Sequence, residues 1–243
     1  MAGHSKWSNI KRRKEAVDDK RGKVFSKLGR ELLQAVRSGG PDPETNAVLR
    51  DVIAKAKSYN MPNDSIRRSI ERASGEGGGA ILDEILYEGY GPGGVAVMVR
   101  ALTDNRNRTA GEVRHLFSKY GGNLGQDGSV AFQFERKGSL VIERQPDLDE
   151  DQIFMDALEA GAEDVDLDDE NIIAITTAPD DYGAVRDALA DKYSFVDQGL
   201  GYQPSSTISL SSQEDRDKME TMIDKLEDND DVQEIYHNWE EEA

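Results

Sequence analysis

The chain has 243 residues, 37% of them hydrophobic and 32% charged, a globular composition sufficient for one large domain or two to three small ones. It contains no cysteine, which excludes disulfides and cysteine nucleophiles, and its formal net charge is -18. No apolar run approaches the ~18 residues of a membrane span, and the basic N-terminus lacks the apolar stretch of a signal peptide. We therefore expect a cytoplasmic protein with no membrane segment.

The charge is segregated along the chain. Residues 1–37 hold eleven Lys or Arg and four Asp or Glu, residues 38–138 hold thirteen of each sign, and residues 139–243 hold six against thirty-one. Screening at physiological salt acts over about 8 Å, so the acidic end does not neutralise a basic end that it does not touch. The basic end is therefore suited to a polyanion, while the acidic end keeps the protein soluble.

Three helices are predicted in the first third of the chain. Residues 1–22 show little apolar periodicity and are expected to form a flexible or conditionally ordered arm. Apolar residues recur at helical spacing from Val24 until Gly39 and Gly40 end the helix. A second helix is expected over about 44–59 and a third from Asn63 or Asp64, as N-cap, to Gly75. Each apolar stripe is too narrow to stand alone, which predicts a three-helix bundle followed by a glycine linker. The stripe of the second helix comprises Val48, Val52, Ile53 and Ala56.

Beyond the linker the apolar period changes to two. Residues 85–90 and 95–102 are predicted to be strands joined by a glycine turn, 107–122 a helix and 129–136 a strand. A strand, a helix and a strand over 207–237 supply the matching half. Between the two halves, residues 139–197 give the order β-α-β-β-α-β.

The predicted fold class is α+β, with an N-terminal three-helix domain followed by two ferredoxin-like α/β domains, the second inserted into the first. The predicted domains are residues 1–79, residues 80–136 with 203–243, and residues 137–202. A single α/β domain with one continuous sheet is the alternative.

Nucleic-acid binding is predicted for the basic arm and the helix that follows it. Lysine and arginine neutralise phosphates, and a tryptophan among them can stack on a base. The alternative is a solvated tail. The candidate contact residues are Lys6, Trp7, Lys11, Arg12, Arg13, Lys14, Lys20, Arg21, Lys23, Lys27, Arg30 and Arg37.

A second contact surface is predicted on the first α/β domain, formed by Tyr90, Pro92, Asn105, Arg106 and Arg108. The glycine-rich turn that holds Tyr90 lacks the GK[ST] ending of a phosphate loop, so a plain hairpin turn is its alternative. The arginines stand at a strand-to-helix junction, where their forked donors suit phosphate or base edges. A helix-capping segment is the alternative there.

Catalytic and metal-binding patterns are absent from the sequence. The run DVDLDD at 164–169 has Asp169 where a calcium loop needs glycine and Ile175 where it needs glutamate. The three histidines are scattered, and no HExxH or GxSxG occurs. We expect no enzyme, no metal and no cofactor.

Several long motifs resemble the YebC family. They are MAGHSKW (1–7), KRGKVFSKLGREL (20–32), NMP (60–62), YEGYGPGG (87–94), DNRNRT (104–109), EVRHLFSKYGGNLG (112–125), SVAF (129–132), ALEAGAEDV (157–165) and DDVQEIYHN (230–238). The resemblance implies a helical domain followed by two α/β domains around a cleft, with no known catalytic chemistry. Members of that family look like DNA-binding transcriptional regulators under one description. Under another they look like ribosome-associated translation factors, including mitochondrial activators and bacterial proteins that help ribosomes through proline-rich stretches.

The distribution of charge favours RNA on the ribosome over DNA. The second and third helices show no clear basic recognition face, and a long duplex would be repelled by the acidic end. On a ribosome, a basic arm can enter an RNA groove while acidic surface faces basic ribosomal proteins. A DNA-binding regulator and a protein-only adaptor that uses the acidic domains remain the alternatives, and we expect a monomer.

Overall fold

The computed structural model describes residues 2–75 and 81–240, with side chains from residue 21 onward. Its chain forms two compact units, one of Met1–Gly78 with Arg136–Gly201 and one of Gly79–Glu135 with Tyr202–Ala243. The three-helix region and the second sheet described below belong to the same unit, so the predicted boundaries of three separate domains stay a prediction.

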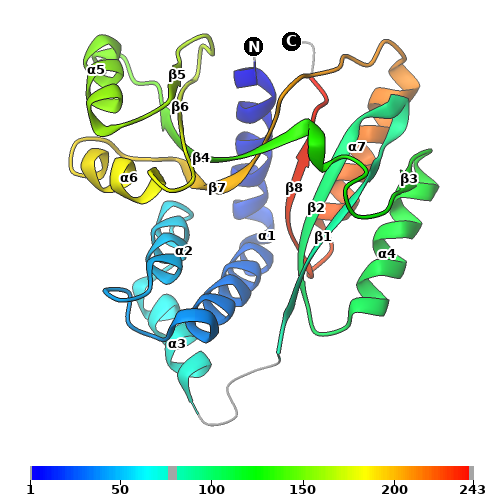
Figure 1. Ribbon diagram of the computed structural model, residues 1–243, viewed down its shortest axis with the longest axis horizontal. Coiled ribbons are helices and arrows are strands. Elements are labelled where there is room, and N and C mark those ends of the chain that lie inside the picture. The colour runs from blue at the N-terminus through cyan, green and yellow to red at the C-terminus, as the bar shows by residue number, and fades with distance from the viewer. Residues whose placement is uncertain (1, 76–80, 241–243) are drawn as a thin grey trace. The chain divides into compact units, whose positions relative to one another are not determined.

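The first unit begins with three helices, α1 (Ala2–Gly39), α2 (Ala47–Ser58) and α3 (Asn63–Ser74) (Figure 1). Helix α1 already runs through residues 2–22, so the structure has an ordered helix where the sequence predicted a flexible or conditionally ordered arm. Its core face carries Leu28, Leu32, Ala35 and Val36, which pack against α2 and α3. The predicted three-helix region is confirmed, although Val48 of its expected apolar stripe is 55% exposed.

The corner between α1 and α2 depends on Gly40 and Asn46. Gly40 has a φ of 88°, a left-handed conformation that favours glycine. The Asn46 side chain accepts a hydrogen bond from the Leu49 backbone N–H at 3.0 Å and donates to the carbonyls of Ala35 and Gly40, both at 2.8 Å. One amide therefore caps α2 and satisfies two carbonyls at the end of α1.

The third helix starts without a side-chain cap. Its N-cap is Pro62, not the predicted Asn63 or Asp64, and no side chain hydrogen-bonds there. The fixed φ of proline still suits the entry to a helix, and Asp64 places an acid in the first turn, where the helix dipole favours it.

The second sheet has the strand order β5-β6-β4-β7. Its elements follow the predicted order β-α-β-β-α-β, with α5 and α6 packed on one face through Ile153, Ala157, Tyr182, Val185 and Leu189 (Figure 1). The elements are β4 (Phe134–Glu143), α5 (Glu150–Ala160), β5 (Asp164–Asp166), β6 (Ile172–Thr177), α6 (Tyr182–Ala190) and β7 (Asp197–Pro204). This order of strands and helices is that of a ferredoxin-like fold.

The first sheet has the order β3-β1-β2-β8, and its neighbouring strands pair antiparallel. Helices α4 and α7 cover one of its faces (Figure 1), burying Val113, Phe117, Met222 and Ile223 against it. The elements are β1 (Asp83–Tyr90), a 3-10 turn η1 (Pro92–Gly94), β2 (Ala96–Thr103), α4 (Arg106–Lys119), β3 (Asn123–Leu124), α7 (Gln213–Glu227) and β8 (Val232–His237). Two separate four-stranded sheets rule out the alternative of one continuous sheet.

Two predicted strands of this half are wrong. Residues 129–136 contain the 3-10 turn η2 (Ala131–Gln133), and the strand that starts at Phe134 is β4 of the second sheet. Residues 207–211 contribute only an isolated bridge between Ile208 and Trp239. The two-residue strand β3 takes an edge of the sheet instead, so the first sheet lacks the predicted β-α-β-β-α-β order.

Within the first unit, a buried ion pair joins α2 to α6. Arg186 is 3% exposed, and its guanidinium pairs with Asp51 on α2 and with the exposed Asp187 on its own helix. Close by, the Tyr59 hydroxyl donates to Asp197 at 3.2 Å, and the Gln198 side chain donates to the Ala54 carbonyl.

We predict that Asp51→Ala lowers the free energy of unfolding by about 2 kcal/mol, because it leaves the buried guanidinium of Arg186 with only one carboxylate. Asp187→Ala is the matched control, since it removes an exposed partner of the same guanidinium and should cost less than about 1 kcal/mol. Urea denaturation measures both variants. Equal costs would contradict a dominant role for Asp51.

Candidate functional site

The predicted nucleic-acid contacts of the N-terminal segment all lie on one continuous helix, α1. For seven of them only the helical backbone lies within the described structure, namely Lys6, Trp7, Lys11, Arg12, Arg13, Lys14 and Lys20. A helix holds these positions at 1.5 Å of rise per residue. The basic block of residues 11–14 therefore spans about one turn of the helix.

Four of the described cations of α1 lie away from its core face. Lys23, Lys27, Arg30 and Arg37 recur at spacings of four, three and seven residues, which places them on one side of the helix. Lys23 and Arg37 are exposed, and Lys27 and Arg30 are half-buried. The core residues of the same helix occupy the other side. The helix thus separates an apolar face from a cationic one.

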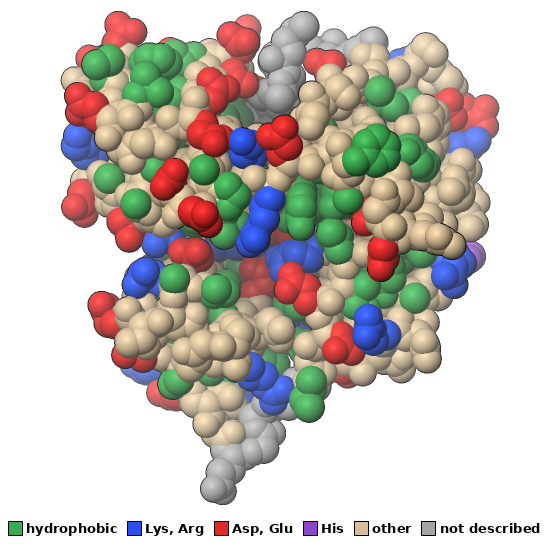
Figure 2. Space-filling view, viewed as in Figure 1, with side chains coloured by type: hydrophobic (Ala, Val, Ile, Leu, Met, Phe, Trp, Pro, Cys, Tyr) green, Lys and Arg blue, Asp and Glu red, His purple; other side chains and the backbone are tan. Residues whose placement is uncertain are grey.

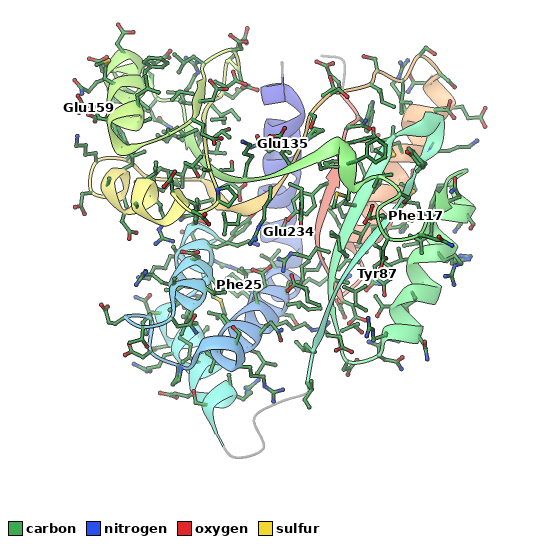
Figure 3. All side chains as sticks on the ribbon, viewed as in Figure 1. Phe25, Tyr87, Phe117, Glu135, Glu159 and Glu234 are labelled. Carbon is green, nitrogen blue, oxygen red and sulfur yellow. The ribbon has the colours of Figure 1, made fainter. Side chains whose placement is uncertain are left out.

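Arg21, the remaining predicted contact on α1, is exposed and lies over the ring of Phe25, 5.6 Å from its centroid. The Phe25 ring, labelled in Figure 3, packs at the edge of the helical core. A guanidinium at this distance from an aromatic face is attracted to it. This contact stabilises the Arg21 side chain over the ring of Phe25, which lies one helical turn further along.

The structure does not bring the five residues of the predicted second contact surface together. In the β1–β2 ladder, Tyr90 pairs with Ala96 at one end and Asp83 pairs with Thr103 at the other. Strands of this length separate the two ends by about 24 Å. Tyr90 and Pro92 therefore stand at one end of the hairpin, and Asn105, Arg106 and Arg108 follow the other.

At the turn end of the hairpin, Tyr90 and Pro92 contact other residues of the protein. Pro92 is buried, and the Tyr90 hydroxyl donates to the Ser129 carbonyl at 3.3 Å and accepts from the Gln133 amide at 3.2 Å. The turn between the strands is the predicted glycine turn. Gly93 there has a φ of 64°, and a Cβ at that position would lie 2.2 Å from Leu210, so only glycine fits.

At the other end, Arg108 and Asn105 build the start of α4. The Asn105 side chain caps the helix by accepting from the Arg108 backbone N–H at 3.1 Å. The Arg108 guanidinium donates to Asp231 at 2.7 Å and to Asp104 at 2.9 Å. These bonds, that to Asp231 first, raise the pKa of Arg108 above its ordinary value. Asn105 thus has the capping role that was the alternative for this segment, and the Arg108 side chain is engaged in ion pairs.

The buried Asp231 carboxylate is the centre of this corner. It is 3% exposed, and its Oδ2 also accepts from the hydroxyls of Thr109 at 2.7 Å and Thr103 at 3.2 Å. One oxygen therefore ties the end of β2 and the start of α4 to the residue that precedes β8. This geometry gives a structural reason for the DNRNRT and DDVQEIYHN motifs.

Arg106 differs from Arg108. Its side chain is 67% exposed and comes no closer than 4.0 Å to a carboxylate, that of Asp83. Burial raises the pKa of Tyr87, whereas Arg106 and Arg114 lower it and Asp231 raises it. Both arginines therefore lie near Tyr87 (labelled in Figure 3), on the side of the sheet that carries α4.

The outer face of α4 carries cations that sequence reasoning missed. Arg114, His115 and Lys119 are exposed, and within residues 81–240 neither Arg114 nor His115 has a hydrogen-bond or ion-pair partner. Lys119 lies over the Tyr120 ring at 5.4 Å. The sequence contains a signal for this surface. If the inward face of the helix is formed by Val113, Leu116, Phe117 and Tyr120, then residues 114, 115 and 119 face outward.

A second buried carboxylate fixes the loop beside Tyr90. Glu88 accepts from the backbone N–H groups of Gly128 at 2.8 Å, Val130 at 2.9 Å and Ala131 at 2.8 Å. Burial alone would raise the pKa of Glu88, but these three donors outweigh it and hold the pKa below its ordinary value. The loop carries Phe132, whose side chain is 75% exposed.

Neither a metal-binding cluster nor a membrane-spanning helix is found among the described residues. Among residues 21–75 and 81–240, no three His, Asp or Glu side chains group in a way suited to a metal ion. The searched helices also include none that is both long and apolar enough to cross a bilayer. The run DVDLDD forms β5 and the turn that follows it.

Comparison with known proteins finds relatives along nearly the whole chain. The family described as "TACO1/YebC protein N-terminal domain" matches residues 5–76, and that described as "TACO1/YebC second and third domain" matches residues 82–239. A "Probable transcriptional regulatory protein" of Finegoldia magna is 55% identical over 243 residues and covers 100% of both chains. A protein of the same description from Acetivibrio thermocellus is 53% identical, covering 98% of this chain and 99% of its own.

A solved structure supports the fold. The crystal structure of a conserved hypothetical protein from Aquifex aeolicus has a TM-score of 0.83 and 44% sequence identity, and the match covers 92% of each chain. The family matches and the full-length relatives confirm the resemblance seen in the sequence motifs.

We predict that Asp231→Ala lowers the free energy of unfolding by about 3 kcal/mol, because two buried hydroxyls and a guanidinium lose their shared acceptor. Arg106→Gln, which removes an exposed cation on the same corner, should change stability by less than about 0.5 kcal/mol. Both are measured by urea denaturation. A stable Asp231→Ala protein would show that the corner is held by other contacts.

The Glu88 contacts predict loss of stability in acid. A carboxyl whose pKa is lowered by folding stabilises the protein above its unfolded-state pKa, and that contribution disappears as the pH falls through the lower, folded-state pKa. The difference in stability between the wild type and Glu88→Gln should therefore be largest at neutral pH and shrink below about pH 4. Urea denaturation between pH 7 and pH 3 measures it, and a constant difference would contradict the assignment.

Proposed function

The chain belongs to the TACO1/YebC family, and from this premise we propose that it is a non-enzymatic regulator of gene expression that binds nucleic acid through the cationic face of α1. The single observation that carries the proposal is this helix, which separates a basic face from a core face in a protein of net charge -18. The names of its relatives, probable transcriptional regulatory proteins, support the regulatory role.

The outer face of α4 supplies a second cationic surface, made of Arg106, Arg114, His115 and Lys119. It shares Arg106 with the second contact surface predicted from the sequence. Helix α7 packs beside α4 on the same hydrophobic core and carries six acidic and three basic residues. A broad polyanion laid across both helices would meet repulsion, so the α4 surface suits a single backbone of phosphates.

The identity of the nucleic acid is the finer part of the proposal, and we favour RNA on the ribosome. Helix α3 is a poor duplex-reading helix, because Arg67 pairs with Asp64 at 2.9 Å and Arg68 donates to the Asp64 carbonyl. The acidic region after residue 136 suits basic ribosomal proteins better than a long duplex. The resemblance of the sequence motifs to the family implies the finer role that we propose, a translation factor that aids elongation through proline-rich sequences.

Transcriptional regulation by DNA binding is the second candidate, favoured by the names of the relatives as probable transcriptional regulatory proteins. It predicts tighter binding to duplex DNA than to RNA at equal salt.

The test is fluorescence anisotropy with labelled single-stranded RNA and duplex DNA across a salt series. Arg114→Gln with Lys119→Gln should reduce the slope of log affinity against log salt by about 1.4 on a single strand, about 0.7 for each phosphate contact. Lys218→Gln with Lys225→Gln is the matched control, because it removes the same charge from α7. Replacing the four cations at 11–14 by glutamine should reduce the slope by about 0.7 for each of them that contacts a phosphate, and by about 2.8 at most.

Sedimentation of a lysate through sucrose distinguishes the two targets. Co-migration with ribosomes that the 11–14 variant loses is the expected result. Absence from ribosomal fractions, together with tighter duplex binding, would assign the protein to DNA. Unchanged affinity and slope in every variant would overturn nucleic-acid binding through these helices.

A further inference from the structure

Helix α5 leaves one face without a partner in its own unit. The Asp149 side chain caps its start by accepting from the Gln152 backbone N–H at 3.1 Å, and Gly161, in the left-handed conformation, ends it. Ile153 and Ala157 are 1% and 0% exposed and fix the inward face against the second sheet. The register of the helix is thereby set, and the opposite face lies outward.

That outward face is apolar. Phe154, Met155 and Leu158 are 37%, 52% and 43% exposed, three of the large hydrophobic side chains that remain accessible in the described chain. Their spacing places them within one turn of each other. Figure 2 shows hydrophobic side chains gathered over the region of α5, with acidic side chains at the edges. Clustered apolar exposure on a folded surface marks an interaction site.

Two carboxylates flank the three apolar side chains. Asp151 lies three residues before Phe154, and Glu159 follows Leu158. Both are exposed, and neither has a hydrogen-bond or ion-pair partner through its side chain among residues 21–75 and 81–240. Figure 3 shows Glu159 on α5 pointing away from the sheet. A ligand over the apolar side chains would thus meet negative charge on its borders.

The surrounding segment has no cations left to neutralise that charge. Residues 137–201 contain eighteen Asp or Glu and four Lys or Arg. Each of the four cations is already engaged with a carboxylate, in the pairs Lys137 with Glu163, Arg144 with Glu150, Arg186 with Asp51 and Lys192 with Asp156. The electrostatic field at α5 is therefore negative and favours a cationic partner.

We propose that the outer face of α5 is a docking surface for a cationic amphipathic segment of a partner protein. Apolar side chains of that segment cover Phe154, Met155 and Leu158, and its Lys or Arg side chains meet Asp151 and Glu159. Nucleic acid is repelled by the same charge. A second copy that offered the same face would bring like carboxylates together. The surface is independent of the nucleic-acid binding proposed above.

The test uses the full chain and a synthetic helical peptide of about eighteen residues, with leucines on one face and lysines on the other. Calorimetric titration should detect binding to the wild type. Met155→Gln with Leu158→Gln should weaken it about tenfold or more, because both side chains stand at the centre of the contact. Asp151→Asn with Glu159→Gln should weaken it and reduce its salt dependence. Circular dichroism checks that each variant is folded.

Two controls separate this site from general attraction to an acidic protein. Val48→Gln removes another exposed apolar side chain, on α2, and should leave the affinity unchanged. A peptide in which serine replaces every leucine keeps the charge and should bind at least about tenfold more weakly. Equal binding of the two peptides, or undiminished binding to Met155→Gln with Leu158→Gln, would overturn the proposal. So would self-association of the wild type, seen by sedimentation velocity, that the same variant abolishes, because the occupant would then be a second copy.

Discussion

A carboxylate removed from water needs donors that replace its hydration, and this requirement organises both units of an acid-rich chain. In the first unit, Glu31 pairs with Lys55 between α1 and α2, and Asp156 accepts from the Tyr193 hydroxyl at 2.7 Å and from the Gln152 amide at 2.9 Å. In the second unit, Glu88 closes a loop and Asp231 closes a corner. Each of these groups joins segments that are separate in the sequence or fixes one turn of a helix. The acids that remain exposed then set the surface potential, so one residue type serves both stability and recognition.

Apolar periodicity was a sufficient guide to most of the fold. The helices α2 to α7 and the hairpin of β1 and β2 lie where a period of 3.6 or 2 placed them, because their core faces are continuous. The wrong predictions concern segments in which the apolar periodicity is weak or fits more than one structure. Residues 131–133 resemble a strand in composition, yet the backbone N–H groups nearby are drawn to Glu88 and a 3-10 turn forms instead. Residues 2–22 show little apolar periodicity in the sequence, yet their backbone continues the helix of residues 24–36, a continuity that local periodicity does not predict.

The candidate site shows a different limit. Charge and residue type selected Arg106 and Arg108 equally, but only the position of Asp231, more than a hundred residues later, reveals that Arg108 is a structural cation. Conversely, Arg114, His115 and Lys119 became visible as a surface once the inward face of α4 was fixed by Val113 and Phe117. Sequence thus identifies which groups bind anions well, whereas tertiary contacts decide which of them are already occupied by the protein itself.

The continuity of α1 has a consequence for the thermodynamics of recognition. Fixing the backbone of one residue costs about 1–2 kcal/mol of conformational entropy, so a basic tail that ordered only on its target would lose a large part of its interaction energy in becoming ordered. A tail that is already helical, as the backbone from Ala2 to Gly39 is, has met that cost during folding. Its binding should therefore show a smaller unfavourable entropy and a smaller change in heat capacity than coupled folding and binding, and the spacing of its charges would select targets by geometry as well as by charge.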